Sequence, residues 1–385
     1  MDAKKILTNK SFCPLPWTGF ELEPNGNVKN CIISNSTLGN IKDNDIETIM
    51  QDKTNTDLKL EMLRDSKPSN CSGCHLQESH RKDLSSISSR LYYMKELLKS
   101  TDISLYNNVK NFSLQHVDLR WTNHCNQACV YCGPDYSSTW AKEIGVLVKS
   151  DSDARSKVKK FVFVNAPQLK NIYLAGGEPL LMNENKELLE ILLDKNPTVN
   201  IRVNTNLSST GTGVYQLLCK FKNVHWTVSV DTMTKEYEYI RYRGNWNDFV
   251  KNLEHIRTLD HKISFNMLFF IFNYDSIYHT VDVLKYMGFH ENSFIIGPLY
   301  GPRVLNVLNL PDKILDNVRN KLSHEIKHSG HYLKNSFENI LKYINETAWQ
   351  KDINGFKQFM KKLDQRRNLS SQITFEKVYR DIDDV

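Results

Sequence analysis

The sequence has no apolar run long enough to span a membrane, and its polar first ten residues lack the apolar stretch of a signal peptide. It also contains no internal repeat and no low-complexity tract, which argues against a repeat or fibrous protein. These absences favour a soluble, cytoplasmic protein. With 385 residues, of which 40% are apolar, the chain can bury a sizeable core in two or three domains.

A strong excess of one charge is also missing. The formal net charge is +6, and lysine and arginine are spread along the chain. The densest basic stretch, Arg155 to Lys160, lies in a helix-like segment beside Asp151 and Asp153, so it indicates a solvated helix face rather than a nucleic-acid patch. Charge alone therefore names no partner.

Cysteine, in contrast, is present in an uneven pattern. Eight cysteines in a chain of this kind indicate metal ligation or redox chemistry rather than disulfides. Cys219 stands alone in an apolar helical pattern, which predicts a buried, inert thiol. The others fall into an N-terminal set of four and a tight central trio: Cys13, Cys31, Cys71, Cys74, and then Cys125, Cys129, Cys132.

The chain has two regions that differ in their pattern of predicted secondary structure. Residues 1 to about 100 are loop-rich, with a β-hairpin predicted over 17–31 and helical segments over 46–64 and 84–99. From about residue 114, strands and helices alternate, and beyond Pro311 the pattern is helical to the end. The predicted strands are 114–121, 171–176, 199–204, 225–230, 262–271 and 293–297, and helices include 184–194, 212–221, 246–258 and 275–287.

Six β-α units in a row indicate an α/β fold with a parallel sheet and crossover helices. Six are too few for a closed eight-stranded barrel, so an open, partial barrel and a doubly wound sheet both fit.

The cysteine trio lies in the motif Cys125-Asn-Gln-Ala-Cys129-Val-Tyr-Cys132, directly after the first predicted strand of this region. Thiolates are soft ligands that suit iron–sulfur clusters and zinc. One loop can wrap three corners of a cubane and leave the fourth iron open. A zinc site completed by His124 or a distant cysteine is the alternative on spacing alone.

The following strand ends in Gly176-Gly177-Glu178-Pro179. Two glycines allow the backbone to approach a ligand closely, and the Glu178 carboxylate can accept from a cationic amine. By itself this sequence would suit an ordinary strand-to-helix turn. Its position, at the end of the strand after the cysteine loop, gives it weight.

Together these two motifs resemble the radical S-adenosylmethionine (SAM) superfamily, over roughly residues 114 to 300. The resemblance implies a partial (β/α)6, TIM-like barrel in which the trio holds a [4Fe–4S] cluster and SAM chelates the open iron. It places Gly176, Gly177 and Glu178 at the SAM amine. Tyr131 would lie against the adenine, and Ser229 or Asp231 would contact the ribose. Weaker similarities at strand ends add Asn204 and Arg243 as cofactor-binding candidates, with Asn273 in a similar context.

The four N-terminal cysteines are the right number for a closed site, and spacing alone leaves zinc and an iron–sulfur cluster about equal. Their pattern resembles the SPASM/twitch auxiliary-cluster module, here placed before the core. Four cysteines suggest the shorter twitch form, with one auxiliary cluster for electron transfer or redox tuning. If Cys13 is not a ligand, an open iron there could bind substrate. The expected domains are 1–100 (auxiliary module), 101–305 (radical SAM core) and 306–385 (helical extension).

The resemblance implies a function. A SAM-bound cluster, reduced by a donor such as flavodoxin or ferredoxin, would yield a 5′-deoxyadenosyl radical that abstracts hydrogen from a peptide or small metabolite. No catalytic residue beyond the cluster ligands is assigned, and neither a membrane nor nucleic acid is expected as a partner. Two alternatives stay open: a zinc-stabilised nucleic-acid-binding protein, and a radical SAM enzyme acting on RNA or a nucleotide.

Overall fold

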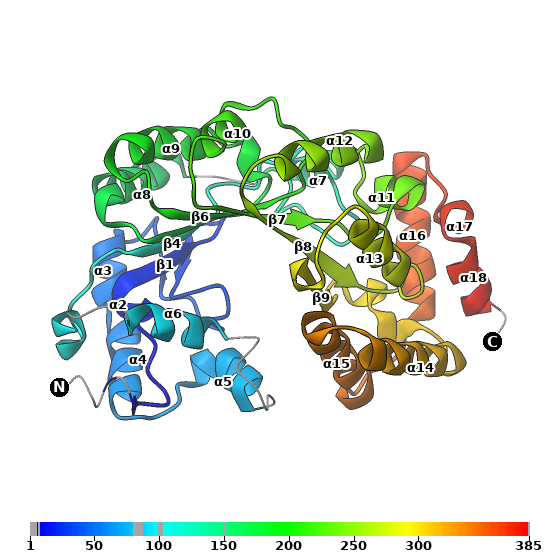
Figure 1. Cartoon of the computed structure of the whole chain (residues 1–385), viewed down its shortest axis with the longest axis horizontal. Helices are drawn as coiled ribbons and strands as arrows, with labels where there is room; N and C mark the ends of the chain where they lie inside the picture. The colour runs from blue at the N-terminus through cyan, green and yellow to red at the C-terminus, as the bar shows by residue number, and fades with distance from the viewer. Residues whose placement is uncertain (1–5, 7, 80–87, 99–102, 149–150, 384–385) are drawn as a thin grey trace. The chain divides into compact units, whose positions relative to one another are not determined.

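The computed structural model describes residues 6, 8–79, 88–98, 103–148 and 151–383 (Figure 1). The chain divides into two compact units: residues 1–124, 145–204 and 211–225 form the first, and 125–144, 205–210 and 226–385 form the second. No helix in the described part of the chain is long and apolar enough to cross a membrane.

The first unit is built on a sheet whose strands lie in the order β3-β2-β1-β4-β5-β6. Strands β1, β4, β5 and β6 are parallel to one another, and β2 and β3 are added in antiparallel fashion. The strand bounds are β1 Gly19–Leu22, β2 Asn27–Lys29, β3 Gly39–Asn40, β4 His116–Leu119, β5 Asn171–Leu174 and β6 Asn200–Thr205.

The predicted hairpin over 17–31 is confirmed as the antiparallel pair β1–β2. The sequence did not predict where it lies. Strand β1 pairs in parallel with β4, with Gly19 opposite His116 and Leu22 opposite Leu119. The cysteine-rich N-terminal segment therefore extends the same sheet that the later β-α units build.

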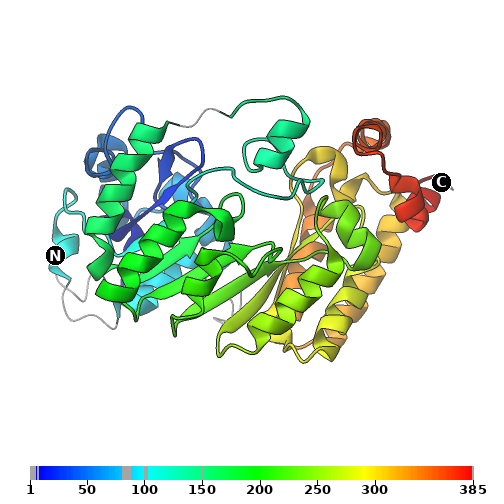
Figure 2. The same ribbon diagram turned by 90° about the horizontal axis from the view of Figure 1, so that it is seen from above.

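Alternation of side chains gives this sheet two different faces. Tyr93 of helix α6 packs edge-on against His116, so the face carrying His116 and Asp118 looks toward α6, and Val117 and Leu119 look the other way. Figure 1 shows α8 and α9 on one side of the strands and α4 and α6 on the other, and Figure 2 shows the green helices lying across the strands. The helices are α2 Leu15–Thr18, α3 Ile46–Gln51, α4 Lys53–Leu63, α5 Ser72–Ser79, α6 Ser89–Leu97, α8 Ser152–Val164, α9 Asn183–Lys195 and α10 Gly213–Leu218.

Two predicted helical segments are confirmed within the described residues. The helical stretch predicted over 46–64 forms two helices, because α3 ends at Gln51 and α4 starts at Lys53. Asp52 between them has an extended backbone, and its carboxylate accepts from the Thr54 N–H as an N-cap. The prediction over 84–99 is confirmed for α6, whereas residues 84–87 and 99 lie outside the described residues.

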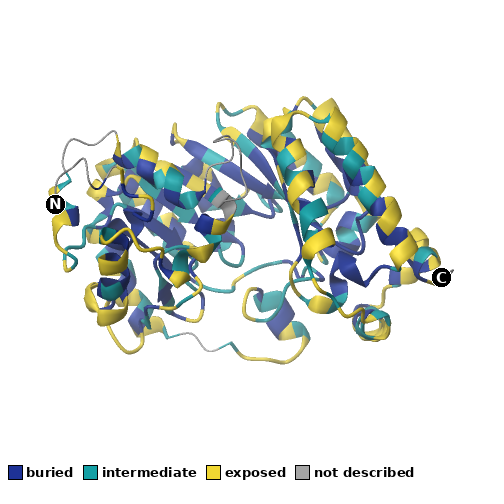
Figure 3. Ribbon diagram, turned by 90° about the horizontal axis from the view of Figure 1, so that it is seen from below, coloured by how far each residue is buried: buried dark blue, intermediate teal, exposed yellow. Residues whose placement is uncertain are grey.

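The second unit contains most of β7, followed by β8 and β9, and β8 and β9 are parallel. The predicted helical C-terminus is confirmed, and Figure 3 shows helices in this region exposed on one side and buried on the other. The bounds are β7 Val224–Ser229, β8 Lys262–Phe269, β9 Phe294–Pro298, α7 Ser138–Glu143, α11 Thr234–Ile240, α12 Trp246–Arg257, α13 Ile277–Tyr286, α14 Asp312–His328, α15 His331–Glu346, α16 Ile353–Arg367, α17 Ser371–Thr374 and α18 Glu376–Asp383.

Candidate active site

The central cysteine trio lies on one loop of the second unit, between β4 and α7. The Ala128 N–H donates to the Tyr242 carbonyl (3.0 Å), and the Val130 N–H donates to the Ile240 carbonyl (2.8 Å). These strand-like bonds fix the middle of the loop. All three cysteine residues are partly exposed.

Helix α7 holds both ends of this loop through its first turn. The Thr139 hydroxyl donates to the Cys125 carbonyl (2.7 Å), and the Trp140 indole N–H donates to the Cys129 carbonyl (2.7 Å). Ser138 also bonds the Cys125 backbone. The backbone carbonyls of Cys125 and Cys129 therefore accept hydrogen bonds from α7.

A buried arginine sits beside the middle cysteine. Burial raises the pKa of Cys129 and raises that of Cys132 to about 12, and the Arg241 guanidinium opposes both shifts. Its Nη1 lies 4.0 Å from the Cys129 Sγ, and its Nη2 lies 2.8 Å from Asp231 Oδ2. A positive charge so close stabilises the thiolate form that metal ligation needs.

Asp231, just past the end of β7, is 1% exposed and fully engaged. Its Oδ2 accepts from the Tyr131 hydroxyl (2.7 Å) and from Arg241, and its Oδ1 accepts from the Leu268 N–H (2.9 Å). The Asn273 side chain donates to the Asp231 carbonyl (3.0 Å). This network fixes the Tyr131 ring beside the loop.

Helix α16, in the helical C-terminal region, docks next to α7. Arg367 donates from Nε to both Glu143 oxygens (3.2 Å), and its guanidinium lies over the rings of Trp140 (4.8 Å) and Tyr242 (4.4 Å). Only 1% of its side chain is exposed. The neighbouring Arg366 also reaches Glu143 (3.4 Å) but is 37% exposed. The structure thus places this basic pair against α7, the helix that holds the cysteine loop.

The glycine turn belongs to the first unit and packs on the residues that lead into the cysteine loop. Gly176 has φ +105°, and a Cβ at Gly177 would lie 2.2 Å from the His124 carbonyl oxygen. The Glu178 N–H donates to the same oxygen (2.7 Å). Both glycines are therefore required by geometry. The Glu178 carboxylate is buried and accepts from the Leu180 N–H (3.2 Å), capping the turn that follows.

The remaining predicted residues lie in different surroundings. Asn204, on β6 in the first unit, has a buried Oδ1 with no hydrogen-bond partner. Ser229 ends β7 and is half-buried. Arg243 has φ +71° and lies against the ring of its neighbour, Tyr242, so Arg241 is the guanidinium that reaches the cysteine loop.

Sequence reasoning missed three contacts of this loop: Asn206, Trp140 and Arg241. The Asn206 Nδ2 lies 3.9 Å from the Cys125 Sγ and donates to Asn126 Oδ1 (3.1 Å). Asn206 carried a signal, because it stands with Asn204 at the end of β6. Trp140 and Arg241 carried none, since a helical tryptophan and one arginine among several look ordinary in sequence.

The four N-terminal cysteines come together in the first unit. Burial is the main cause that raises the pKa of each thiol, to about 11 for Cys31 and about 12 for Cys71. Repulsion by the other three thiolates raises the pKa of Cys13 further, so the four lie within electrostatic reach of one another. Cys13 packs in a core with Phe12 and Trp17.

Several polar groups beside these cysteines lack a hydrogen bond. Both side-chain amide atoms of Asn30 and both ring nitrogens of His75 are buried without one, and the two residues adjoin Cys31 and Cys74 in sequence. The His75 Nδ1 lies 3.9 Å from a Glu78 oxygen, and Glu78 forms an ion pair with Arg90 (2.5 Å). A buried Asn30 amide without a hydrogen bond beside an all-thiolate set fits a group that carries sulfur acceptors. In the described part of the chain, no three His, Cys, Asp or Glu side chains surround a single-ion position.

Comparison with known families gives two matches. Residues 119–284 match the radical SAM superfamily, and residues 13–75 match SPASM, an iron–sulfur cluster-binding domain. The first span contains the central trio, and the second contains all four N-terminal cysteines. The chain thus carries a radical SAM domain preceded by an iron–sulfur cluster-binding domain, and its cofactors are SAM and iron–sulfur clusters. The match over residues 13–75 describes an iron–sulfur site rather than a zinc module.

Individual relatives are distant. The chain is 25% identical to the GTP 3′,8-cyclase of Sulfurimonas denitrificans over 33% of its own length and 37% of that protein. It is 21% identical to the same enzyme of Campylobacter lari over 51% of its own length and 62% of that protein. The chain therefore spans between about a third and three fifths of these curated relatives.

Solved structures give a similar, weak likeness. Streptococcus suis SuiB bound to the precursor peptide SuiA is 12% identical, with a TM-score of 0.41 over 77% of this chain and 67% of that one. Native anSMEcpe with bound AdoMet is 14% identical, with a TM-score of 0.40 over 56% of this chain and 62% of that one.

Proposed function

We propose that this chain, with its radical SAM domain and its iron–sulfur cluster-binding domain, is an enzyme that cleaves SAM reductively to a radical that abstracts hydrogen from a substrate. The observation that carries the proposal is the single loop of Cys125, Cys129 and Cys132. It offers three thiols. The side-chain amides of Gln127 and Asn206 and the Arg241 guanidinium, which lie 3.9 to 4.0 Å from the sulfurs, are not iron ligands. When bound at an open iron, SAM supplies a 5′-deoxyadenosyl radical on one-electron reduction.

The chain's own residues would bind and orient this cofactor. Gly176 and Gly177 let the backbone approach the methionyl amine, with Glu178 holding their turn in place. Tyr131, fixed by Asp231, would present its ring to the adenine. Ser229 is the better ribose contact of the two candidates, because both Asp231 oxygens already accept hydrogen bonds.

Asn204 and Arg243 also remain proposed cofactor contacts, and the structure supports Asn204 more strongly than Arg243. The buried, unpaired Oδ1 of Asn204 is an acceptor that a bound molecule would satisfy. Arg243 is supported by less, since its guanidinium has only the ring of Tyr242 as a neighbour among the contacts described. Arg241 takes the position next to the cysteine loop and pairs with Asp231.

The N-terminal set would hold a second cluster with four protein ligands. A fully ligated cluster offers no open iron, so its role would be electron transfer or redox tuning. An external reductant of the flavodoxin or ferredoxin type would supply the electron.

A peptide is the leading substrate. The auxiliary module favours it by analogy with relatives that modify peptides. A nucleotide is the second candidate, favoured by the curated relatives, whose name is GTP 3′,8-cyclase.

Anaerobic reconstitution tests the proposal. The wild-type protein should bind about eight irons and as many sulfides, and with reductant and SAM it should form 5′-deoxyadenosine. Cys129→Ala should form none, whereas the matched control Cys219→Ala should behave as wild type. A fully loaded wild-type protein that leaves SAM intact would contradict the proposal.

A further inference from the structure

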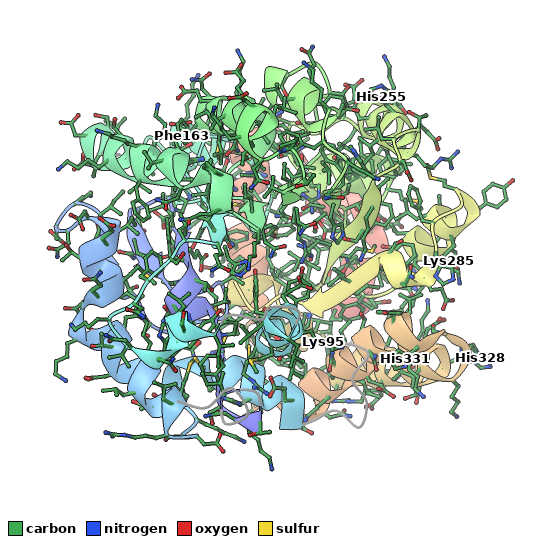
Figure 4. All side chains as sticks on the ribbon, turned by 60° about the vertical axis from the view of Figure 1, so that its left-hand side comes forward. Lys95, Phe163, His255, Lys285, His328 and His331 are labelled. Carbon is green, nitrogen blue, oxygen red and sulfur yellow. The ribbon has the colours of Figure 1, made fainter. Side chains whose placement is uncertain are left out.

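Two polar side chains of the second unit are buried close to the middle cysteine of the trio. Polar residues of this unit such as His255 and Lys285, labelled in Figure 4, are exposed. Gln127 and Tyr237, in contrast, are each 1% exposed. Gln127 lies on the cysteine loop, two residues before Cys129, and Tyr237 lies on α11. Burying polar groups is costly unless they are hydrogen-bonded, so both positions require an explanation.

Both side chains carry a polar atom without a partner. The Nε2 of Gln127 and the hydroxyl of Tyr237 are buried and make no hydrogen bond with any described residue. Each such group costs on the order of 1–3 kcal/mol, so two of them indicate that something compensates. The Gln127 carbonyl accepts from the Ser137 hydroxyl (2.6 Å), which holds the backbone at this position. A change of partner therefore requires a turn of the side chain rather than a movement of the loop.

The two unpaired groups are neighbours. A Cβ placed at Gly244 would lie 3.0 Å from the Gln127 Nε2 and 3.1 Å from Cε1 of Tyr237, the ring carbon next to the one that bears the hydroxyl. Burial raises the pKa of Tyr237, and Arg241 and the Gln127 amide oppose that shift, which also places the amide beside the phenol. The lack of a side chain at Gly244 leaves room for both groups.

The other end of the amide faces sulfur. The Cys129 Sγ lies 3.9 Å from the Gln127 Oε1, a pairing in which the thiol S–H donates and the amide oxygen accepts. A cysteine that ligates iron is a thiolate without a proton, so it can only accept hydrogen bonds. With a cluster bound, the amide oxygen would face a negatively charged sulfur while the donor Nε2 pointed away from it.

A half-turn of the amide removes both problems. The oxygen and nitrogen of a glutamine side chain exchange places on rotation about its last bond, and the two ends have nearly the same shape. Nε2 would then donate to the Cys129 sulfur, and Oε1 would accept from the Tyr237 hydroxyl. One rotation thereby pairs both unpaired groups and supplies a donor to the cluster ligand.

We propose that Gln127 donates a side-chain N–H hydrogen bond to the Cys129 sulfur of the bound cluster, and that Tyr237 is the positioning residue that holds the amide in this orientation. The proposal rests on the proposed function, because it needs a cluster on the trio, and it adds a control of that cluster's reduction potential. A hydrogen bond to a cluster sulfur stabilises the reduced form, in which the sulfur carries more negative charge, and so raises the potential.

A buried water molecule is the competing explanation for the two unpaired groups. Water between Nε2 and the phenol would leave the amide oxygen facing the Cys129 sulfur. The partial negative charge of that oxygen would then lower the potential, and replacing Gln127 by leucine would raise it. The two explanations therefore predict shifts of opposite sign.

A redox titration of the fully reconstituted protein, followed by electron paramagnetic resonance, tests the proposal. The signal of the trio's cluster is the one that is missing from Cys129→Ala. We expect Gln127→Leu to lower the equilibrium constant for reduction about tenfold, which corresponds to about 59 mV for one electron. Tyr237→Phe should lower it less. The double variant should match Gln127→Leu alone, since Tyr237 acts through the amide.

Tyr239→Phe is the matched control, because Tyr239 lies on the same helix and its hydroxyl donates to Asp364 instead. This variant also loses a hydrogen bond, so it should lower the stability of the protein without moving the potential. An unchanged or higher potential in Gln127→Leu, additive shifts in the double variant, or an equal shift in Tyr239→Phe would overturn the proposal.

A second measurement keeps the test decisive should Gln127→Leu fail to fold. Wild-type protein that is isotopically labelled at the glutamine side-chain nitrogen should show a hyperfine coupling of that nitrogen in the pulsed resonance spectrum of the trio's cluster. Tyr237→Phe should weaken the coupling, and its absence in the wild type would contradict the proposal. Identical spectra of the wild type and Cys129→Ala would show that the loop holds no cluster, and the proposed function would then fail together with this inference.

Discussion

The two cysteine sets differ in how the chain assembles them. The central trio lies within eight residues of one loop, which α7 and the 240–242 backbone hold in place. The N-terminal four are drawn from residues 13 to 74 and meet only when the hairpin, α4 and α5 are folded. Local sequence therefore builds the first site, and tertiary structure builds the second.

Their electrostatic surroundings also differ. Arg241 and Arg367 act on Cys129 and favour its thiolate form. Near the N-terminal set, the Arg90 charge is shared with Glu78, and carboxylates add to the burial that raises the thiol pKa values. A cluster at the trio would be easier to reduce than a cluster at the N-terminal set, because positive charge stabilises the added electron.

The largest difference that we expect between the two cysteine sets is in SAM cleavage. Cys129→Ala should abolish 5′-deoxyadenosine formation and lower the iron content from about eight to about four per chain. The double variant Cys71→Ala/Cys74→Ala should also lose about four irons but keep cleaving SAM without substrate. Iron analysis and product assays on both variants check this. Equal loss of SAM cleavage would show that the two sets do not act separately.

The second effect is on stability. Clusters that connect distant segments restrict the unfolded chain, and a closure of this length contributes about 4 kcal/mol. We expect the Cys71→Ala/Cys74→Ala variant to unfold roughly 10 °C below wild type and Cys129→Ala to change far less. Anaerobic thermal unfolding measures both. A larger drop for Cys129→Ala would reverse the comparison.

The same contrast explains what the sequence could predict. Spacing singled out the trio and the glycine turn as candidate site residues, and strand and helix periodicity correctly predicted the parallel sheet. Periodicity did not predict that β1 pairs with β4, because parallel partners far apart in sequence leave no local signal. For the same reason it missed the docking of Arg367 on Trp140, which joins residues from opposite ends of the domain. The cap at Asp52 was overlooked because helical periodicity continues through it.

A third prediction concerns the cofactor rather than the clusters. Gly177→Ala places a Cβ 2.2 Å from the His124 oxygen, so the turn must shift at a cost of about 1–3 kcal/mol. SAM affinity, measured by equilibrium dialysis, should fall about tenfold or more. Gly133→Ala is the control, since its Cβ meets nothing within 4 Å. Equal affinities of the two variants would remove the glycine turn from the SAM site.

The smallest expected effect is a shift in potential. Arg367→Met removes a buried charge near Cys129, and Arg366→Met removes a more exposed one from the same helix. The reduction potential of the trio's cluster should fall by about 30–60 mV in the first variant and by much less in the second, since solvent screens exposed charges. A redox titration followed by electron paramagnetic resonance measures both. Equal shifts of the reduction potential in the two variants would show that the buried charge of Arg367 has no specific effect on the cluster.

The central claim is that the trio is an open site and the N-terminal set a closed one. The most direct test is the electron paramagnetic resonance spectrum of the reduced protein with and without SAM, in Cys71→Ala/Cys74→Ala and in Cys129→Ala. The account predicts that SAM changes the spectrum of the first variant and leaves that of the second unchanged. A SAM-dependent change only in Cys129→Ala would contradict it.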